Sequence, residues 1–283
     1  MKIGVSSYSF AQYMNETKAN YFQIIDLAKE MGFDAIEFID LKLEVQPAES
    51  LAALAKQIRD YCAQKELPIA AYTVGADFLN HENEVQRIKD QIDLAVILGA
   101  PVLRHDAFWS MPDGMTWRQA VEKVAPLIRE VTEYAAEKGV RTCTENHGLI
   151  LQDAERVEEL IRTVNNPNYG WLVDMGNFLC ADDNPLRAVP VAAPYAFHAH
   201  VKDFIFKSFS DDDPGDGWIH TRNGNYIRGT VAGHGVVPIR KCLSILNDAG
   251  YQGVVSYEFE GPEQNLPALR SALKFIRKAG ETR

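Results

Sequence analysis

The feature that most constrains this chain is a short apolar, β-branched run followed by a longer segment with helical periodicity, repeated eight times. The runs predicted as strands are residues 2–7, 34–39, 68–73, 101–105, 140–146, 170–174, 197–202 and 252–259. The segments predicted as helices are residues 20–31, 48–65, 83–99, 117–138, 153–164, 185–193, 237–249 and 265–279. Strands that alternate with helices of this length pair in parallel. The pattern therefore predicts an α/β fold with a parallel sheet.

The count of eight favours a closed barrel over an open, doubly wound sheet. A barrel of eight βα units takes about 250 residues by itself, and this chain has 283. No Pro/Gly/Ser-rich linker divides the sequence, and the glycine motifs GxGxxG and GxxxxGK[ST] of nucleotide-binding sheets do not occur in it. We expect a (β/α)8 TIM barrel that forms a single domain over residues 1–283.

One connection is much longer than the others. Residues 203–235 follow the seventh predicted strand and are rich in Asp, Gly and Asn. A loop of this length in a compact domain is usually functional or mobile. It lies on the face where barrel enzymes place their active sites, so we predict a loop that could act as a lid.

Charge and cysteine content limit the partners and the compartment. Lys plus Arg is 29 and Asp plus Glu is 39, which gives a net charge of −10 without a basic run. This balance argues against nucleic acid and anionic membranes as partners. The cysteines are Cys62, Cys143, Cys180 and Cys242. They form no CxxC pair, and the first residues lack the apolar core of a signal peptide, so we expect a cytoplasmic protein.

The last four predicted strands each carry a carboxylate or an imidazole near their carboxyl ends, which meet at one rim. These residues are Glu145, Asp174, His200 and Glu258. A single one could form a salt bridge or a helix cap, but carboxylates crowded together resist ionisation unless a cation neutralises them. Three carboxylates and one imidazole suit a hard divalent cation. We predict one divalent metal ion, with Mn²⁺ first and Mg²⁺, Co²⁺ or Zn²⁺ as alternatives.

A metal ion at this rim indicates a class of chemistry. A cation that chelates the carbonyl and the neighbouring hydroxyl of a sugar acidifies the C–H between them and stabilises an enediolate. Glu145 and Glu258 come from the fifth and eighth strands and can approach the metal from different sides. We therefore predict that both are catalytic, as the acid and the base. The same site could serve isomerisation, epimerisation or β-elimination of water.

Further polar residues near the rim are candidates to bind the substrate. They are Glu37, His105, His147, Asn177, Lys202 and Glu260. Several have a structural alternative: a buried salt bridge for Glu37, a loop hydrogen bond for His147, and an ion pair with Asp203 or Glu260 for Lys202. On the fourth strand we expect His105 to face the rim and Arg104 to pair with a barrel carboxylate.

Several segments, in their order and spacing, resemble the xylose isomerase-like barrel superfamily of sugar (phosphate) isomerases and epimerases, which also contains endonuclease IV. They are Gly32–Glu37, Glu145–His147, Val173–Asn177, His200–Asp203, Gly233–Pro238 and Gly250–Glu258. The resemblance implies a (β/α)8 barrel with one divalent ion on the predicted ligand set. In ketose 3-epimerases of this group the first and last ligand glutamates also handle the proton. The resemblance also suggests a homodimer.

Two departures from the epimerase pattern leave the substrate open. Asn177 stands where those enzymes tend to have His, and His234 stands in a GxG that commonly carries Glu. We expect an isomerase or epimerase of a small sugar or sugar derivative. The alternative is a dehydratase or lyase that acts on a keto-sugar or inosose. Two further hypotheses are a non-catalytic sugar-binding barrel and an AP endonuclease, although that branch needs a His-rich three-metal cluster.

Overall fold

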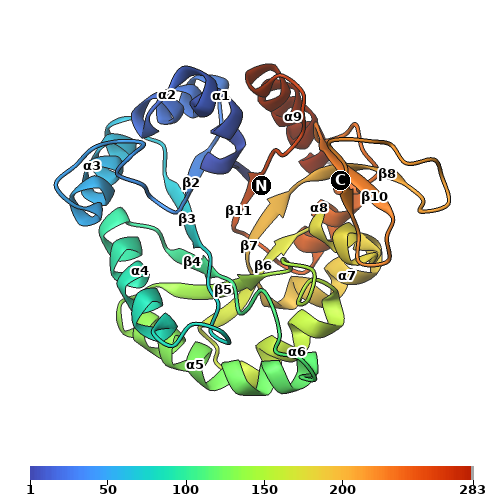
Figure 1. The fold of residues 1–283 in the computed structure, drawn as a ribbon. Helices are drawn as coiled ribbons and strands as arrows, with labels where there is room; N and C mark the ends of the chain where they lie inside the picture. The colour runs from blue at the N-terminus through green and yellow to red at the C-terminus, as the bar shows by residue number, and fades with distance from the viewer. Residues whose placement is uncertain (282–283) are drawn as a thin grey trace.

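Eight parallel strands close into a barrel in the computed structural model, which describes residues 1–281 (Figure 1). The strands are β1 (Lys2–Ser6), β2 (Ala35–Ile39), β3 (Ile69–Val74), β4 (Val102–His105), β5 (Arg141–Glu145), β6 (Tyr169–Asp174), β7 (Ala196–Val201) and β11 (Val254–Tyr257). Each strand pairs with its neighbour in the chain, and β11 pairs with both β7 and β1 to close the ring. The predicted (β/α)8 barrel is confirmed.

An outer ring of helices covers the barrel (Figure 1). The helices are α2 (Tyr21–Met31), α3 (Leu51–Gln64), α4 (Glu84–Leu98), α5 (Trp117–Glu137), α6 (Ala154–Val164), α7 (Pro185–Ala192), α8 (Ile239–Asp248) and α9 (Asn265–Gly280). Local signals fix their ends: Asn20 and Thr116 begin α2 and α5 with capping boxes, and Gly32 ends α2 in the left-handed conformation. No helix within residues 1–281 is long and apolar enough to cross a membrane.

Short helical turns that the sequence pattern did not predict lie between the barrel strands and the outer helices. They are η1 (Ser7–Phe10), α1 (Ala11–Thr17), η2 (Asn177–Ala181) and η3 (Ala193–Tyr195). The pair η1 and α1 follows β1 directly. Its turns place Tyr8 beside the carboxyl ends of the strands, where it lines a cavity described below.

The apolar core has two parts. The larger part lies between the sheet and the helices and includes the fully buried side chain of Trp171. The smaller part fills the barrel interior, where Ala71, Val102, Cys143 and Leu172 contact one another. Because successive side chains of a strand point to opposite faces, residues two positions further along these strands also face the interior. They are polar, and they form the site described next.

The connection at residues 203–235 is more ordered than the predicted loop. It carries β8 (Asp203–Lys207), β9 (Ile219–His220) and β10 (Tyr226–Thr230), which form an antiparallel sheet beside the barrel (Figure 1). Phe204 and Ile227 are buried beneath it, which explains why this polar segment has a fixed shape. A lid function for this sheet stays a prediction.

Candidate metal centre

Four side chains from neighbouring strands converge at the carboxyl end of the barrel. They are the predicted ligands Glu145, Asp174, His200 and Glu258, and one atom from each lies within 4.8 Å of all the others. The Nδ1 of His200 lies 3.8 Å from Oε1 of Glu145 and 3.7 Å from Oδ2 of Asp174. It lies 3.7 Å from Oε2 of Glu258 as well. The structure thus brings the whole predicted set together.

The hydrogen bonding of these four residues tests whether they fit a metal ion. Nδ1 of His200 and Oδ2 of Asp174 are buried and have no hydrogen-bond partner. A buried polar atom without a partner is destabilising by about 1–3 kcal/mol, unless a cation contacts it. Two ligand atoms that each lie about 2.0–2.2 Å from one ion are roughly 3–4 Å apart, which matches the separations at His200. The donor set therefore fits a divalent cation.

The ring of His200 is oriented by a carboxylate from the opposite side of the barrel. Glu37, on β2, is fully buried, and its Oε1 accepts a hydrogen bond from Nε2 of His200 at 2.8 Å. Its Oε2 lies 2.5 Å from Nε2 of His198. When Nε2 carries the proton, Nδ1 presents its lone pair to the other three ligands. Glu37 thus holds the His200 ring with its Nδ1 side facing the candidate metal centre.

Asp174 is held by the backbone that follows it. Its Oδ1 accepts hydrogen bonds from the N–H groups of Gly176 and Asn177, both at 2.8 Å. These bonds fix one oxygen at the start of η2 and leave Oδ2 for the ligand cluster. The sequence Asp-Met-Gly-Asn therefore ends β6 at Asp174 and forms this turn directly after it.

Two cations balance part of the negative charge, one on each side. Arg104 lies 2.8 Å from Oε2 of Glu145 and 2.8 Å from Oδ1 of Asp106. Lys202 lies 2.6 Å from Oε2 of Glu258 and 3.1 Å from Oε1 of Glu260. The site is therefore divided into an arginine side and a lysine side.

The two glutamates of the cluster differ in their pKa values. Burial raises the pKa of Glu145, although Arg104 opposes this effect. Burial also disfavours the charged form of Glu258, but Lys202 and His200 outweigh it and hold its pKa well below the usual value. Without the charge of a metal ion, Glu258 is thus the stronger acid of the pair, and its carboxylate is ionised at neutral pH.

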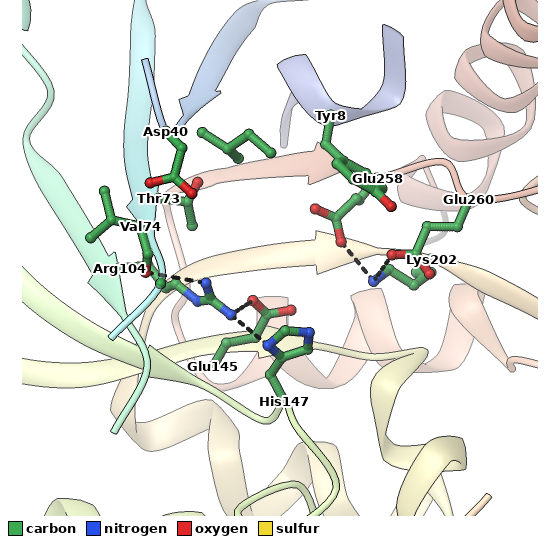
Figure 2. A pocket seen from close by; sticks show the side chains of 12 residues that line it. Tyr8, Asp40, Thr73, Val74, Arg104, Glu145, His147, Lys202, Glu258 and Glu260 are labelled. Atoms are coloured by element: carbon green, nitrogen blue, oxygen red, sulfur yellow. Dashed lines mark hydrogen bonds and ion pairs between the residues drawn. The ribbon is translucent and has the colours of Figure 1, made fainter. Parts of the chain in front are cut away.

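A cavity of about 250 Å³ opens above the cluster (Figure 2). Arg104, Glu145 and His147 line one side of it. Glu258, Lys202 and Glu260 line the other side. Of the six predicted substrate-binding residues, His147, Lys202 and Glu260 therefore reach the cavity.

The other three predicted substrate-binding residues do not line the cavity. Glu37 lies behind His200. Asn177 is buried and donates a hydrogen bond from Nδ2 to Oε1 of Glu145 at 2.9 Å. His105 is fully buried between the rings of Phe78 and Tyr169, and its Nδ1 lies 2.8 Å from the carbonyl oxygen of Asp106. The geometry gives these three side chains supporting positions instead of the substrate contacts that we expected.

The error on the fourth strand has a simple cause. Val102 belongs to the interior cluster, so Arg104, two residues further on, also points inward. His105 then faces the outer layer. Arg104 pairs with a barrel carboxylate as expected, but the sequence analysis did not place it in the cavity wall. The alternation of side chains along β4, counted from the apolar Val102, predicts that Arg104 points inward.

Sequence reasoning also missed Asp40, which lines the cavity at the end of β2. Its backbone has a φ of 29°, an uncommon value for a residue other than glycine, and Asp tolerates this region better than most. Burial raises the pKa of its carboxyl group. Strained positions of this kind cluster at functional sites.

The comparison with protein families agrees with this architecture. A family model described as xylose isomerase-like TIM barrel matches residues 25–279. The chain belongs to this family. The resemblance inferred from the sequence is thereby confirmed, together with the barrel fold that it implied.

Individual members of the xylose isomerase-like family are distant from this chain. The inosose dehydratase of Yersinia enterocolitica (serotype O:8 / biotype 1B) is 24% identical over 168 residues, which are 56% of this chain and 52% of that protein. The chain thus matches about half the length of this curated relative.

Two solved structures share the fold over nearly the whole chain. The IolI protein with a binding zinc atom superposes with a TM-score of 0.78 and 20% identity, over 99% of this chain and 98% of that one. The D-psicose 3-epimerase with D-tagatose from Clostridium cellulolyticum H10 superposes with a TM-score of 0.74 and 17% identity, over 100% of both chains. At these identities the likeness shows the fold.

Proposed function

We propose that this protein is a divalent-metal-dependent dehydratase of a small polyhydroxylated ketone, such as a keto-sugar or an inosose. The observation that carries the proposal is the cluster of Glu145, Asp174, His200 and Glu258, in which two buried atoms have no hydrogen-bond partner, beneath a cavity. The inosose dehydratase activity named for the Yersinia relative supports the same reaction.

The four clustered residues are the proposed metal ligands. A divalent ion bound there would polarise the substrate carbonyl and make the neighbouring C–H more acidic. The zinc atom named for the IolI structure, which shares this fold, supports the choice of a divalent ion. Mn²⁺ stays our first prediction, because three oxygen ligands and one nitrogen suit a hard cation.

Glu258 is the proposed base. Its Oε2 lies 3.7 Å from Nδ1 of His200 and 2.6 Å from Nζ of Lys202, while its Oε1 forms no hydrogen bond within residues 1–281. The side chain is 12% exposed, into the cavity. Glu258 is therefore free to take the proton from the carbon beside the carbonyl.

His147 is the proposed acid for the leaving hydroxyl. Its Nδ1 lies 3.3 Å from Oδ1 of Asp106 and 3.0 Å from Nη2 of Arg104, which leaves Nε2 for a ligand in the cavity. Burial alone would lower the pKa of His147, but the hydrogen bond to Asp106 and the charges of Glu145 and Asp106 together outweigh it and raise the pKa. As the C–H electron pair forms the C=C bond, the C–O bond breaks, and a proton from His147 converts the departing hydroxide into water.

Isomerisation or epimerisation, our expectation from the sequence, is the second candidate. The observation that favours it is a second carboxylate, Glu145, on the opposite side of the cluster from Glu258. Both oxygens of Glu145 already have partners, Asn177 at 2.9 Å and Arg104 at 2.8 Å. This leaves Glu145 less available as a second base, which is why dehydration comes first.

The reaction can be tested by incubating metal-loaded protein in D₂O with a panel of neutral ketoses and inososes. A product lighter by one water supports dehydration. Deuterium incorporation at unchanged composition supports isomerisation or epimerisation instead. Ligand binding without proton exchange would leave a non-catalytic sugar-binding barrel, and cleavage of abasic duplex DNA would point to an endonuclease. A chelator-treated sample and Glu258→Gln serve as the controls for metal and base.

A further inference from the structure

The sequence left open whether the substrate carries a phosphate. We infer that it is an uncharged polyhydroxylated ketone, bound through its hydroxyl groups by Asp40 and Glu260, and that the site rejects phosphorylated sugars. This inference rests on the proposed function and specifies its substrate class. Two separate features support it: the charges that line the cavity, and an internal carboxylate in the place where barrels bind phosphate.

The arginine and the lysine that line the cavity are both already paired with carboxylates. Arg104 is engaged by Asp106 and Glu145, both at 2.8 Å. Lys202 is engaged by Glu258 and Glu260, and its Nζ lies 3.6 Å from Oδ2 of Asp174. No other Lys or Arg lines the cavity in the part of the chain that the structure describes. A phosphate would have to displace one of these carboxylates to pair with either side chain.

Two carboxylates are placed where a neutral polyol would need acceptors. Asp40 lines the cavity, and its carboxylate has no hydrogen bond or ion pair within residues 1–281. Glu260 is 31% exposed and lies on the opposite wall, after β11 (Figure 2). Ionised carboxylates accept hydrogen bonds from hydroxyl groups and repel anions. The two walls therefore favour a polyol and disfavour a sugar phosphate.

The backbone amides that could bind a phosphate are already occupied. In TIM barrels a phosphate site often forms from the loops after the last strands of the barrel, beside the start of a helix. Here the segment before α8 directs three backbone N–H groups at the carboxylate of Asp203. They belong to Gly233, Gly235 and Val237, at 2.8, 2.9 and 3.0 Å.

The carboxylate of Asp203 thus binds these backbone amides in the place of an external anion. The N–H of Phe204 donates to the same carboxylate at 2.9 Å, and Asp203 is buried at the start of β8. Four donors satisfy its two oxygens, so no amide of this group is left for a ligand. Within residues 1–281, a substrate phosphate finds neither an unpaired Lys or Arg in the cavity wall nor a free amide cradle beside it.

The inference is tested by the affinity of the Mn²⁺-loaded protein for matched pairs, D-fructose against D-fructose 6-phosphate and D-tagatose against D-tagatose 6-phosphate, by titration calorimetry. We expect the neutral member of each pair to bind about tenfold or more tightly. In Asp40→Asn the neutral sugar should bind more weakly, and the ratio of the two dissociation constants within each pair should move toward one. Asp248→Asn makes the same charge change near Met1, away from the cavity, and should leave the ratio unchanged.

The outcomes separate this inference from the proposed function. Equal or tighter binding of the phosphorylated members overturns the inference, and dehydration of those members would then leave the proposed reaction standing. Tighter binding of neutral ketones with no exchange of the C–H proton supports the inference and overturns the reaction. If neither member of any pair binds, the inference is overturned, and the proposed reaction is decided by the inososes of the D₂O panel. If Asp40→Asn and Asp248→Asn change the affinity ratio equally, the assignment of Asp40 as an acceptor for substrate hydroxyl groups is overturned.

Discussion

Glu37 accepts a hydrogen bond from Nε2 of His200 at 2.8 Å and so connects β2 with β7 across the barrel interior. Both side chains are fully buried. The second oxygen of Glu37 contacts His198, so rotation of the carboxylate would break two contacts at once. A carboxylate held in this way fixes the tautomer and the direction of a histidine ligand. The candidate metal centre thus depends on a residue outside the ligand set.

Replacing this support should weaken metal binding in a protein that still folds. We expect Glu37→Gln to reduce Mn²⁺ affinity about 10–100-fold, because the amide cannot accept from both histidines. Competition with a chromophoric chelator measures the Kd without reference to activity. Glu133→Gln, at an exposed position on α5, is the matched control. An unchanged Kd in folded Glu37→Gln would show that His200 needs no such support.

Metal binding should release a proton. Burial alone would lower the pKa of His200, but the charges of Glu37 and Glu258 outweigh it and raise that pKa well above the usual value. Metal-free protein is then protonated at His200 at neutral pH, and an ion on Nδ1 must displace that proton. Affinity should therefore rise with pH up to the raised pKa. Calorimetry at pH 7 in two buffers with different ionisation enthalpies measures the release, and identical heats would contradict it.

Loss of the proposed base should stop proton transfer and leave the fold. We expect Glu258→Gln to slow C–H exchange by about 10²–10⁴-fold, the usual contribution of a general base. Lys202 keeps Glu260 at 3.1 Å, so the buried cation retains a partner. Exchange rates in D₂O and the thermal midpoint report the two effects separately. Normal turnover by this variant would remove Glu258 from the mechanism.

Asp203 should matter for stability, and an external anion should replace it in part. Asp203→Ala leaves four backbone N–H groups without their acceptor, which we expect to lower the free energy of unfolding by about 2–4 kcal/mol. Inorganic phosphate should then raise the thermal midpoint of the variant more than that of the unchanged protein. The measurement is a pair of thermal melts with and without phosphate. Equal shifts in both proteins would mean that the vacated amides do not bind anions.

The barrel could be predicted because its signal repeats. Most barrel strands contain an apolar run with a glycine or a capping residue nearby, so the predicted ranges differ from the observed bounds by only a few residues at each end. The four candidate ligands could be predicted for the same reason, because polar side chains at the ends of buried strands stand out. Neither inference required knowledge of side-chain direction.

What the sequence could not give depends on direction and on contacts between distant segments. Arg104 and His105 are adjacent, and only the packing of Val102 in the interior decides which of them faces the cavity. Asp40 follows β2 in a turn whose backbone conformation no periodicity predicts. The sheet of β8, β9 and β10 lies outside the repeat of strands and helices, within a segment rich in Asp, Gly and Asn, so the sequence pattern did not separate its strands from a loop.

The distribution of the site along the chain has a consequence for how the protein could be divided. All four proposed ligands come from residue 145 onward, whereas two of the groups that hold them, Glu37 and Arg104, come from the first half. A fragment containing only the second half would carry every coordinating atom and lack the partners that orient them. When the two halves associate and close the barrel, high affinity for the metal ion should therefore return in the same cooperative step.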